Sequence, residues 1–135
     1  NIKGIIIPDL PYEEAFEMSK KLKENNIALI PLVSVTSGNR IKKIVSQGDG
    51  FIYAIGSLGV TGSKQVDLPR LESFIKEIRK VSDLPVSLGF GIKNNDNVNT
   101  MRKYADGVIV GTSIVDFTFK NDVNYTIQKI NELFK

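Results

Sequence analysis

The chain has 135 residues, of which 41% are hydrophobic and 24% charged, a balance typical of one ordinary globular domain. It contains no Cys, His or Trp, so thiol nucleophiles, disulfides, Cys or His metal sites and Ser-His-Asp triads are excluded within it. Its 18 Lys and Arg residues and 15 Asp and Glu residues give a net charge of +3. Because the two signs are interleaved, we expect no nucleic-acid partner, whereas the slight positive charge suits an anionic small ligand.

The chain shows no sign of membrane insertion or secretion. No apolar run approaches the roughly 20 residues that a membrane helix needs, and no secretory leader precedes the first apolar segment. We therefore expect a soluble, cytoplasmic protein without a membrane partner. The chain starts without Met and enters an apolar run within a few residues, so we expect it to begin in the middle of a fold, with residues 1–135 as a single domain.

Short apolar segments alternate with amphipathic ones along the whole chain. The apolar segments are the predicted strands, and in chain order they are 5–7, 28–33, 51–55, 86–88 and 107–110. The amphipathic segments are the predicted helices, whose apolar residues at helical spacing are Ala15, Met18 and Leu22; Ile41, Ile44 and Val45; Leu71, Phe74, Ile75 and Ile78; Val98, Met101 and Tyr104; and Ile127, Ile130, Leu133 and Phe134. Helix starts are predicted at 36–39, Asp67, 94–97 and 121–122, where capping residues precede these patterns.

This alternation predicts an α/β fold with a parallel sheet, because nearly continuous apolar strands are buried on both faces. The strand count leaves two architectures open, an open doubly wound sheet and part of a closed TIM (βα)8 barrel. The loops at the carboxyl ends of the last three strands favour the barrel. If the last two strands are barrel strands seven and eight, the chain supplies strands four to eight, roughly the C-terminal half of a fold that takes about 250 residues.

Glycines gather in those three loops. They occupy positions 59 and 62, 89 and 91, and 111. Glycine lets the backbone approach a ligand closely, and free amides at the start of a following helix bind an anion, so a phosphate is the expected ligand. Residues 112–117 are placed to form the short extra helix of a barrel phosphate site. Each glycine alone would equally suit a tight turn, and Gly89-x-Gly91 lacks the third glycine of a dinucleotide fingerprint.

Four segments carry a family resemblance. They are Pro8-Asp9-Leu10-Pro11, Gly59-Val60-Thr61-Gly62, Leu88-Gly89-Phe90-Gly91-Ile92 and Val110-Gly111-Thr112-Ser113-Ile114-Val115. In order and spacing they resemble the tryptophan synthase alpha chain, most specifically in Gly-Val-Thr-Gly. The sequence departs from that family at Ser34-Val35-Thr36, Gly56 and Leu58. The family's members are TIM barrels, so the resemblance also implies the carboxyl-terminal part of a barrel.

The resemblance implies a carbon-carbon lyase of tryptophan biosynthesis. Its reaction is the retro-aldol cleavage of indole-3-glycerol phosphate to indole and glyceraldehyde 3-phosphate, without a cofactor or a metal on this chain. The family's catalytic Glu and Asp lie on strand two and the loop after it, outside residues 1–135, so this segment alone is expected to be inactive. The implied partner is the tryptophan synthase beta chain, which carries pyridoxal phosphate, in an alpha2beta2 complex.

The resemblance also implies site residues. It gives phosphate binding to Gly62, Gly91, Gly111 and Thr112 and the indole pocket to Tyr53, Phe90, Ile109, Ile6 and Leu32. Supporting roles fall to Thr61, which matches the residue that orients the family's catalytic Asp, to Tyr53, and to Asp9, which matches a residue that helps to couple the alpha chain to the beta chain. Residues 59–66 would form a closing lid.

Other interpretations of these residues stay open. The apolar strand residues would equally fill the barrel core, Thr61 would equally stabilise its own turn, and Asp9 would equally cap the following helix. For the whole chain, two alternatives are another phosphate-binding barrel enzyme of histidine or tryptophan biosynthesis and an inactive phosphate-binding half-barrel.

Overall fold

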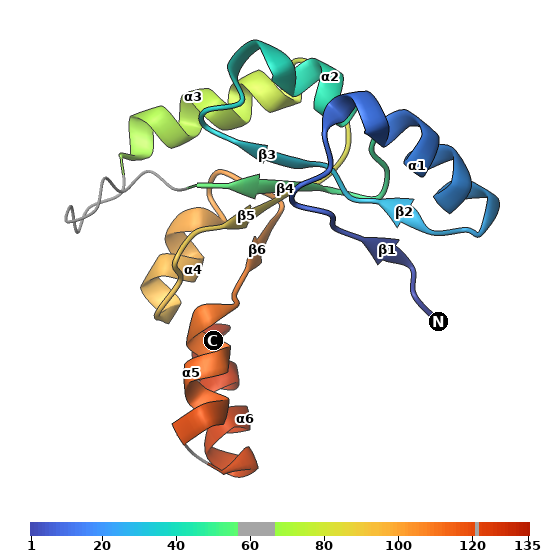
Figure 1. Cartoon of the computed structure of the whole chain (residues 1–135). Coiled ribbons are helices and arrows are strands. Elements are labelled where there is room, and N and C mark those ends of the chain that lie inside the picture. The colour runs from blue at the N-terminus through green and yellow to red at the C-terminus, as the bar shows by residue number, and fades with distance from the viewer. Residues whose placement is uncertain (57–66, 121) are drawn as a thin grey trace.

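Parallel strands alternate with helices along the chain, as the sequence predicts (Figure 1). The computed structural model describes residues 1–56, 67–120 and 122–135. The strands are β1 (Gly4–Ile5), β2 (Ala28–Leu29), β3 (Leu32–Ser34), β4 (Ile52–Ile55), β5 (Val86–Gly89) and β6 (Gly107–Ile109). The helices are α1 (Tyr12–Glu24), the 3-10 turn η1 (Gly38–Arg40), α2 (Ile41–Val45), α3 (Leu68–Arg79), α4 (Asn95–Met101), α5 (Thr112–Lys120) and α6 (Val123–Leu133). In this described part of the chain, no helix combines the length and apolarity needed to cross a membrane.

All strand pairs are parallel, and one predicted strand is divided. The segment 28–33 appears as β2, which pairs with β1, and β3, which begins the four-stranded order β3-β4-β5-β6. The change of partner falls at Pro31: the Ile30 N–H donates to the Ile5 carbonyl at 2.9 Å, while the Pro31 carbonyl accepts from the Tyr53 N–H at 2.9 Å. Because proline has no N–H to donate, the ladder is interrupted there. The five predicted strands are therefore present, in chain order, and the division at Pro31 places them in a two-stranded and a four-stranded sheet.

The two faces of the sheet are buried to different degrees. Side chains at alternate positions of β3, β4 and β5 point towards the helices and are fully buried, and these are Val33, Ile52, Ala54, Val86 and Leu88. They pack with the apolar faces of α3 and α4, so the predicted core residues Leu71, Ile78, Val98 and Met101 are at most 1% exposed. The intervening side chains, which include Leu32 and Tyr53, face the opposite side and are half-buried. The opposite face is thus the one that remains accessible.

Local capping bonds fix where three of the helices begin. The side chains of Asp67, Asn94 and Asp122 accept from backbone N–H groups of the first turn at 2.9–3.0 Å, which confirms the predicted helix starts. The segment 36–39 behaves differently. The Ser37 hydroxyl accepts from the Ser34 N–H at 3.0 Å and so closes its own loop, while η1 starts without a side-chain cap.

Apolar side chains remain exposed at the two ends of the sheet. β1 lies at one end and β6 leads into α5 and α6 at the other (Figure 1). Near β1 and on the last two helices, the exposed apolar residues are Ile2, Ile5, Ile6, Val115, Phe119, Val123 and Ile127. The predicted face of α1 is also less buried than expected. Ala15 and Ser19 are buried but Met18 is 36% exposed, because α1 covers only the end of the sheet.

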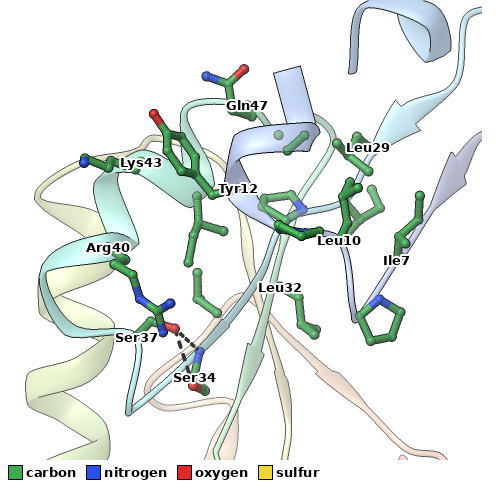
Figure 2. Close-up of a pocket in the computed structure, with 18 of the residues that line it drawn as sticks. Ile7, Leu10, Tyr12, Leu29, Leu32, Ser34, Ser37, Arg40, Lys43 and Gln47 are labelled. Atoms are coloured by element: carbon green, nitrogen blue, oxygen red, sulfur yellow. Dashed lines mark hydrogen bonds between the residues drawn. The ribbon is translucent and has the colours of Figure 1, made fainter. Parts of the chain in front are cut away.

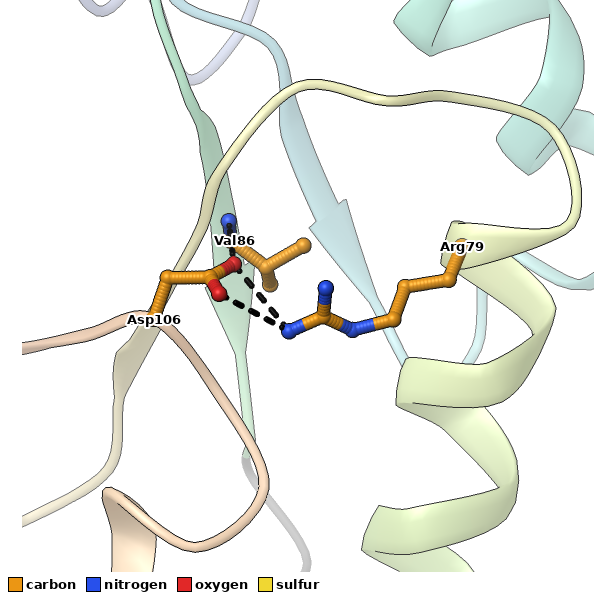
Figure 3. Close-up of polar contacts among 3 residues, drawn as sticks. All are labelled: Arg79, Val86 and Asp106. Carbon is orange, nitrogen blue, oxygen red and sulfur yellow. Dashed lines mark hydrogen bonds and ion pairs between the residues drawn. The ribbon is translucent and has the colours of Figure 1, made fainter.

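Three segments are joined at the amino-terminal end of β5 (Figure 3). The Asp106 carboxylate accepts from the Val86 N–H at 2.8 Å and from the Arg79 guanidinium at 3.1 Å. These bonds connect the end of α3, the start of β5 and the loop before β6. The bond from the Val86 N–H, with the Arg79 guanidinium beside it, holds the pKa of the Asp106 carboxyl below its ordinary value.

Replacing Asp106 by asparagine should lower the free energy of unfolding at pH 7 by about 1 kcal/mol, because the bonds to Arg79 and Val86 lose their charge. A carboxyl with a lowered pKa stabilises the fold above its unfolded-state pKa and loses that contribution as the pH falls through the folded-state value. Urea unfolding at pH 7 and pH 3 should therefore show a smaller pH dependence in the variant than in the parent. Glu72→Gln, which removes only the exposed pair with Lys76, should cost at most about 0.5 kcal/mol. An unchanged pH dependence in Asp106→Asn would contradict this role.

Candidate functional site

A cavity of about 210 Å³ lies at the carboxyl ends of β4, β5 and β6. The residues that line it are Tyr53, Gly89, Phe90, Gly91, Ile92, Ile109, Gly111 and Thr112. Three residues predicted for an indole pocket thus share one cavity with three predicted for a phosphate. The carboxyl ends of parallel strands are where ligands bind in barrel proteins.

Strand register explains why these residues meet. Tyr53 of β4 pairs with Ser87 of β5, and Gly89 of β5 pairs with Ile109 of β6. All four side-chain positions are on the face of the sheet opposite the helices. A Cβ atom added to Gly89 would lie 2.6 Å from the Tyr53 hydroxyl oxygen, so glycine leaves the space that the tyrosine occupies. The tyrosine of one strand therefore reaches across its neighbour towards the cavity.

Gly91 and Gly111 have open space around them. A Cβ atom added to either would meet no other atom within 4 Å. At Gly91 the backbone itself favours glycine, with φ +32°. Gly111 has neither a positive φ nor a close neighbour, so packing in the described structure does not require a glycine there. It directly precedes α5, whose first amides point away from the helix and favour an anion. Gly111 therefore suits the close approach of a ligand.

Ser113 connects the two glycine loops. Its hydroxyl donates to the Ile92 carbonyl, so the first turn of α5 is attached to the loop that contains Gly91. Sequence reasoning assigned no role to Ser113. The only signal is a hydroxyl in the first turn of the expected phosphate helix, and its partner lies 21 residues away, beyond any local pattern.

Ser113→Ala should weaken the binding of inorganic phosphate about three- to tenfold, because one hydrogen bond is worth about 1 kcal/mol and this one keeps the two loops together. Isothermal titration of the complete gene product would measure the change. Thr118→Val is the matched control, since it removes a hydroxyl whose bond among the described residues stays within α5, to the Val115 carbonyl. Equal affinities for the parent and Ser113→Ala would show that the loops do not depend on this bond.

The remaining predicted residues lie elsewhere. Leu32 is the β3 partner of Tyr53 and so lies beside it on the same face, but it lines a different cavity. Ile6 lines neither cavity and is 40% exposed. Asp9 is exposed in the turn after β1 and does not cap α1, whose N-cap is Pro11 without a side-chain bond. Thr61, Gly62 and the predicted lid at 59–66 lie outside the described residues.

The second cavity, of about 430 Å³, lies between α1, α2 and the strands β2 and β3 (Figure 2). Its floor includes Leu29 and Leu32. At its rim the Lys43 ammonium lies 5.6 Å from the centre of the Tyr12 ring, an attractive cation-π contact. Arg40 lies beside the Ser34–Ser37 loop. No predicted phosphate residue lines this cavity, so its greater size does not make it the candidate site.

The residues that line the smaller cavity suit the binding of a ligand. No charged side chain is among the described residues that line it, so an anion there would be held by backbone amides, the α5 dipole and the Thr112 hydroxyl. Aromatic and apolar groups form the rest of its wall. Within the described ranges, no three acidic residues gather closely enough to hold a metal ion.

These features define part of a parallel α/β barrel with a candidate ligand cavity at the carboxyl ends of its strands. The family model of the tryptophan synthase alpha chain matches residues 1–134, and the chain belongs to that family. The alpha chain of Campylobacter jejuni subsp. doylei is 47% identical over 135 residues, which are 99% of this chain and 54% of that protein. The chain therefore spans about half the length of such relatives.

Solved structures agree with this assignment. The alpha subunit from Campylobacter jejuni superimposes with a TM-score of 0.89 at 46% identity, over 98% of this chain and 54% of that one. A tryptophan synthase complex from Pyrococcus furiosus gives a TM-score of 0.82 over 98% of this chain and 54% of that one. At 23% identity, the second comparison shows the fold alone. The chain thus has the fold of about half of a tryptophan synthase alpha TIM barrel.

Proposed function

We propose that the complete gene product carrying residues 1–135 cleaves indole-3-glycerol phosphate to indole and glyceraldehyde 3-phosphate. One observation carries the proposal: in a chain of this family, Tyr53, Phe90 and Ile109 line one cavity together with Gly91, Gly111 and Thr112. An apolar wall beside an anion-binding loop suits a substrate that has an indole ring at one end and a phosphate at the other.

The phosphate would lie at the start of α5. The amides of Gly91 and Gly111 and the hydroxyl of Thr112 would donate to its oxygens, and the α5 dipole would favour its charge. Gly62 is proposed as a further donor. The free space around Gly91 and Gly111 supports this role.

The indole ring would lie against Tyr53, Phe90 and Ile109, with Leu32 and Ile6 as outer wall. Leu32 adjoins Tyr53 across the β3–β4 pair, which supports its inclusion. Ile6 is included for its place directly after β1.

In the reaction, the bond between the indole C3 and the glycerol chain breaks. A base takes the proton of the glycerol hydroxyl, and an acid protonates C3. The residues that line the cavity offer no carboxylate for these steps, so the acid and base are proposed to come from chain outside residues 1–135. The part described here would bind and orient the substrate, and Thr61 would help to position the acid or base. This part by itself is expected to be inactive.

Residues 1–135 are proposed to supply strands four to eight of the complete barrel. The support is the apolar surface at the two ends of the sheet, where Ile5 and Ile6 near β1 and Phe119 of α5 are exposed. Further strands that pair with β1 and β6, together with helices that pack outside them, would cover these side chains and close the sheet into a barrel.

A beta chain that carries pyridoxal phosphate is the proposed partner, in an alpha2beta2 assembly. The support is the family assignment. Asp9 is the proposed contact, because it is exposed and does not cap α1.

Turnover by the complete gene product tests the function. With indole-3-glycerol phosphate, we expect indole and glyceraldehyde 3-phosphate in equal amounts, formed faster when the beta chain is present. A phosphoribosylated aminosugar should not be consumed. Binding of phosphate without turnover, with or without the beta chain, would contradict the lyase and leave a phosphate-binding barrel.

A further inference from the structure

The Phe90 ring lies directly against the backbone of Gly56. Gly56 is buried and follows β4, while Phe90 follows the neighbouring strand β5. A Cβ atom added to Gly56 would lie 2.7 Å from Cδ2 of the Phe90 ring. Carbon atoms in ordinary contact are about 3.5–4.0 Å apart. Any side chain at position 56 would therefore displace the ring.

Gly56 is required for space and not for its backbone angles. It is not among the glycines with positive φ, so its φ angle does not by itself exclude an alanine. The strand ends are also held together here, because the Gly56 N–H donates to the Gly89 carbonyl at 3.1 Å. When a methyl group is added at Gly56, the element that moves is thus the ring and not the backbone.

Among the described residues, the cavity is the side on which the ring has room to move. Phe90 packs against the buried core on one side and lines the 210 Å³ cavity on another. The core is closely packed, and a methyl group at position 56 would block movement of the ring towards β4. A displaced ring therefore turns into the cavity and takes up part of its small volume.

We propose that Gly56 is a specificity-determining position. Because it has no side chain, the Phe90 ring can pack against the end of β4, and this position of the ring determines the cavity volume that is left for the indole end of the ligand. This inference rests on the proposed function and assigns a role to a residue that does not itself line the cavity. Gly56 acts through Phe90, so it is a positioning residue and not a catalytic one.

The test is a double-mutant cycle in the complete gene product, with Gly56→Ala, Phe90→Leu and the double variant. Two probes are titrated, an indolylalkyl phosphate and inorganic phosphate. Gly56→Ala should weaken the indolylalkyl phosphate about tenfold and change inorganic phosphate less than twofold. In the Phe90→Leu background, the same Gly56→Ala change should alter the indolylalkyl phosphate less than twofold, because the smaller side chain leaves room for the methyl group.

Gly107→Ala is the matched control. It adds a methyl group to another crowded glycine of the sheet, 2.9 Å from the Ser87 hydroxyl oxygen, and should change neither affinity more than twofold. If Gly56→Ala leaves the indolylalkyl phosphate unaffected, weakens both probes equally, or acts equally in the Phe90→Leu background, the inference is wrong. If the parent protein binds neither probe, the proposed function fails and this inference fails with it.

Discussion

Replacing Gly111 by valine should weaken phosphate binding by about 100-fold, or about 2.7 kcal/mol, in the complete gene product. The valine side chain would extend into the open space in front of α5, where we place the phosphate. The fold should tolerate it, because Gly111 has no neighbour within 4 Å of a built Cβ and no positive φ. We expect the free energy of unfolding to fall by less than about 1 kcal/mol, the typical cost of an unfavourable residue at a helix start.

Titration with inorganic phosphate measures this effect, and urea unfolding measures stability. Thr118→Val is again the matched control, because it places a valine within α5, which Gly111 precedes, without entering the cavity. Its phosphate affinity should change less than twofold. If Gly111→Val binds phosphate as tightly as the parent protein, the phosphate is not held at the start of α5.

The largest effect on stability is expected for Leu88→Ala. Leu88 is fully buried on β5, which pairs with β4 on one side and β6 on the other. Truncation there would leave a cavity that the neighbouring strands cannot fill by moving, so the free energy of unfolding should fall by about 3 kcal/mol. The urea midpoint should decrease without a change in the slope of the transition.

The matched control for this experiment is Val81→Ala. Val81 follows α3 and is 37% exposed, so its truncation should cost less than about 1 kcal/mol. Because Leu88 points towards the helices and away from the cavity, phosphate affinity under native conditions should change less than twofold in Leu88→Ala. A loss below about 1 kcal/mol for Leu88→Ala would mean that the core of the complete protein is arranged differently.

Much of the candidate site could be predicted from the sequence, because it depends on strand ends. Glycines at the ends of consecutive strands must come close together in a parallel sheet, and Gly91 and Gly111 do. Leu32 and Ile6 do not join this cavity. Leu32 lines the larger cavity, and Ile6 lines neither of the two. Their places depend on the change of strand partner at Pro31, where pairing with β1 ends and pairing with β4 begins. The apolar pattern does not contain that information.

The sequence by itself determined the order of strands and helices, the helix starts at Asp67, Asn94 and Asp122, and the family. These features arise from hydrophobic periodicity and from hydrogen bonds between residues three positions apart, both of which are local.

Only the tertiary structure decided the contacts between distant segments: the Phe90 ring against Gly56, the Ser113 hydroxyl on the Ile92 carbonyl, and the Asp106 carboxylate between α3 and β5. Such contacts join residues 20 or more positions apart, and they exist because strand register and helix packing bring those residues together.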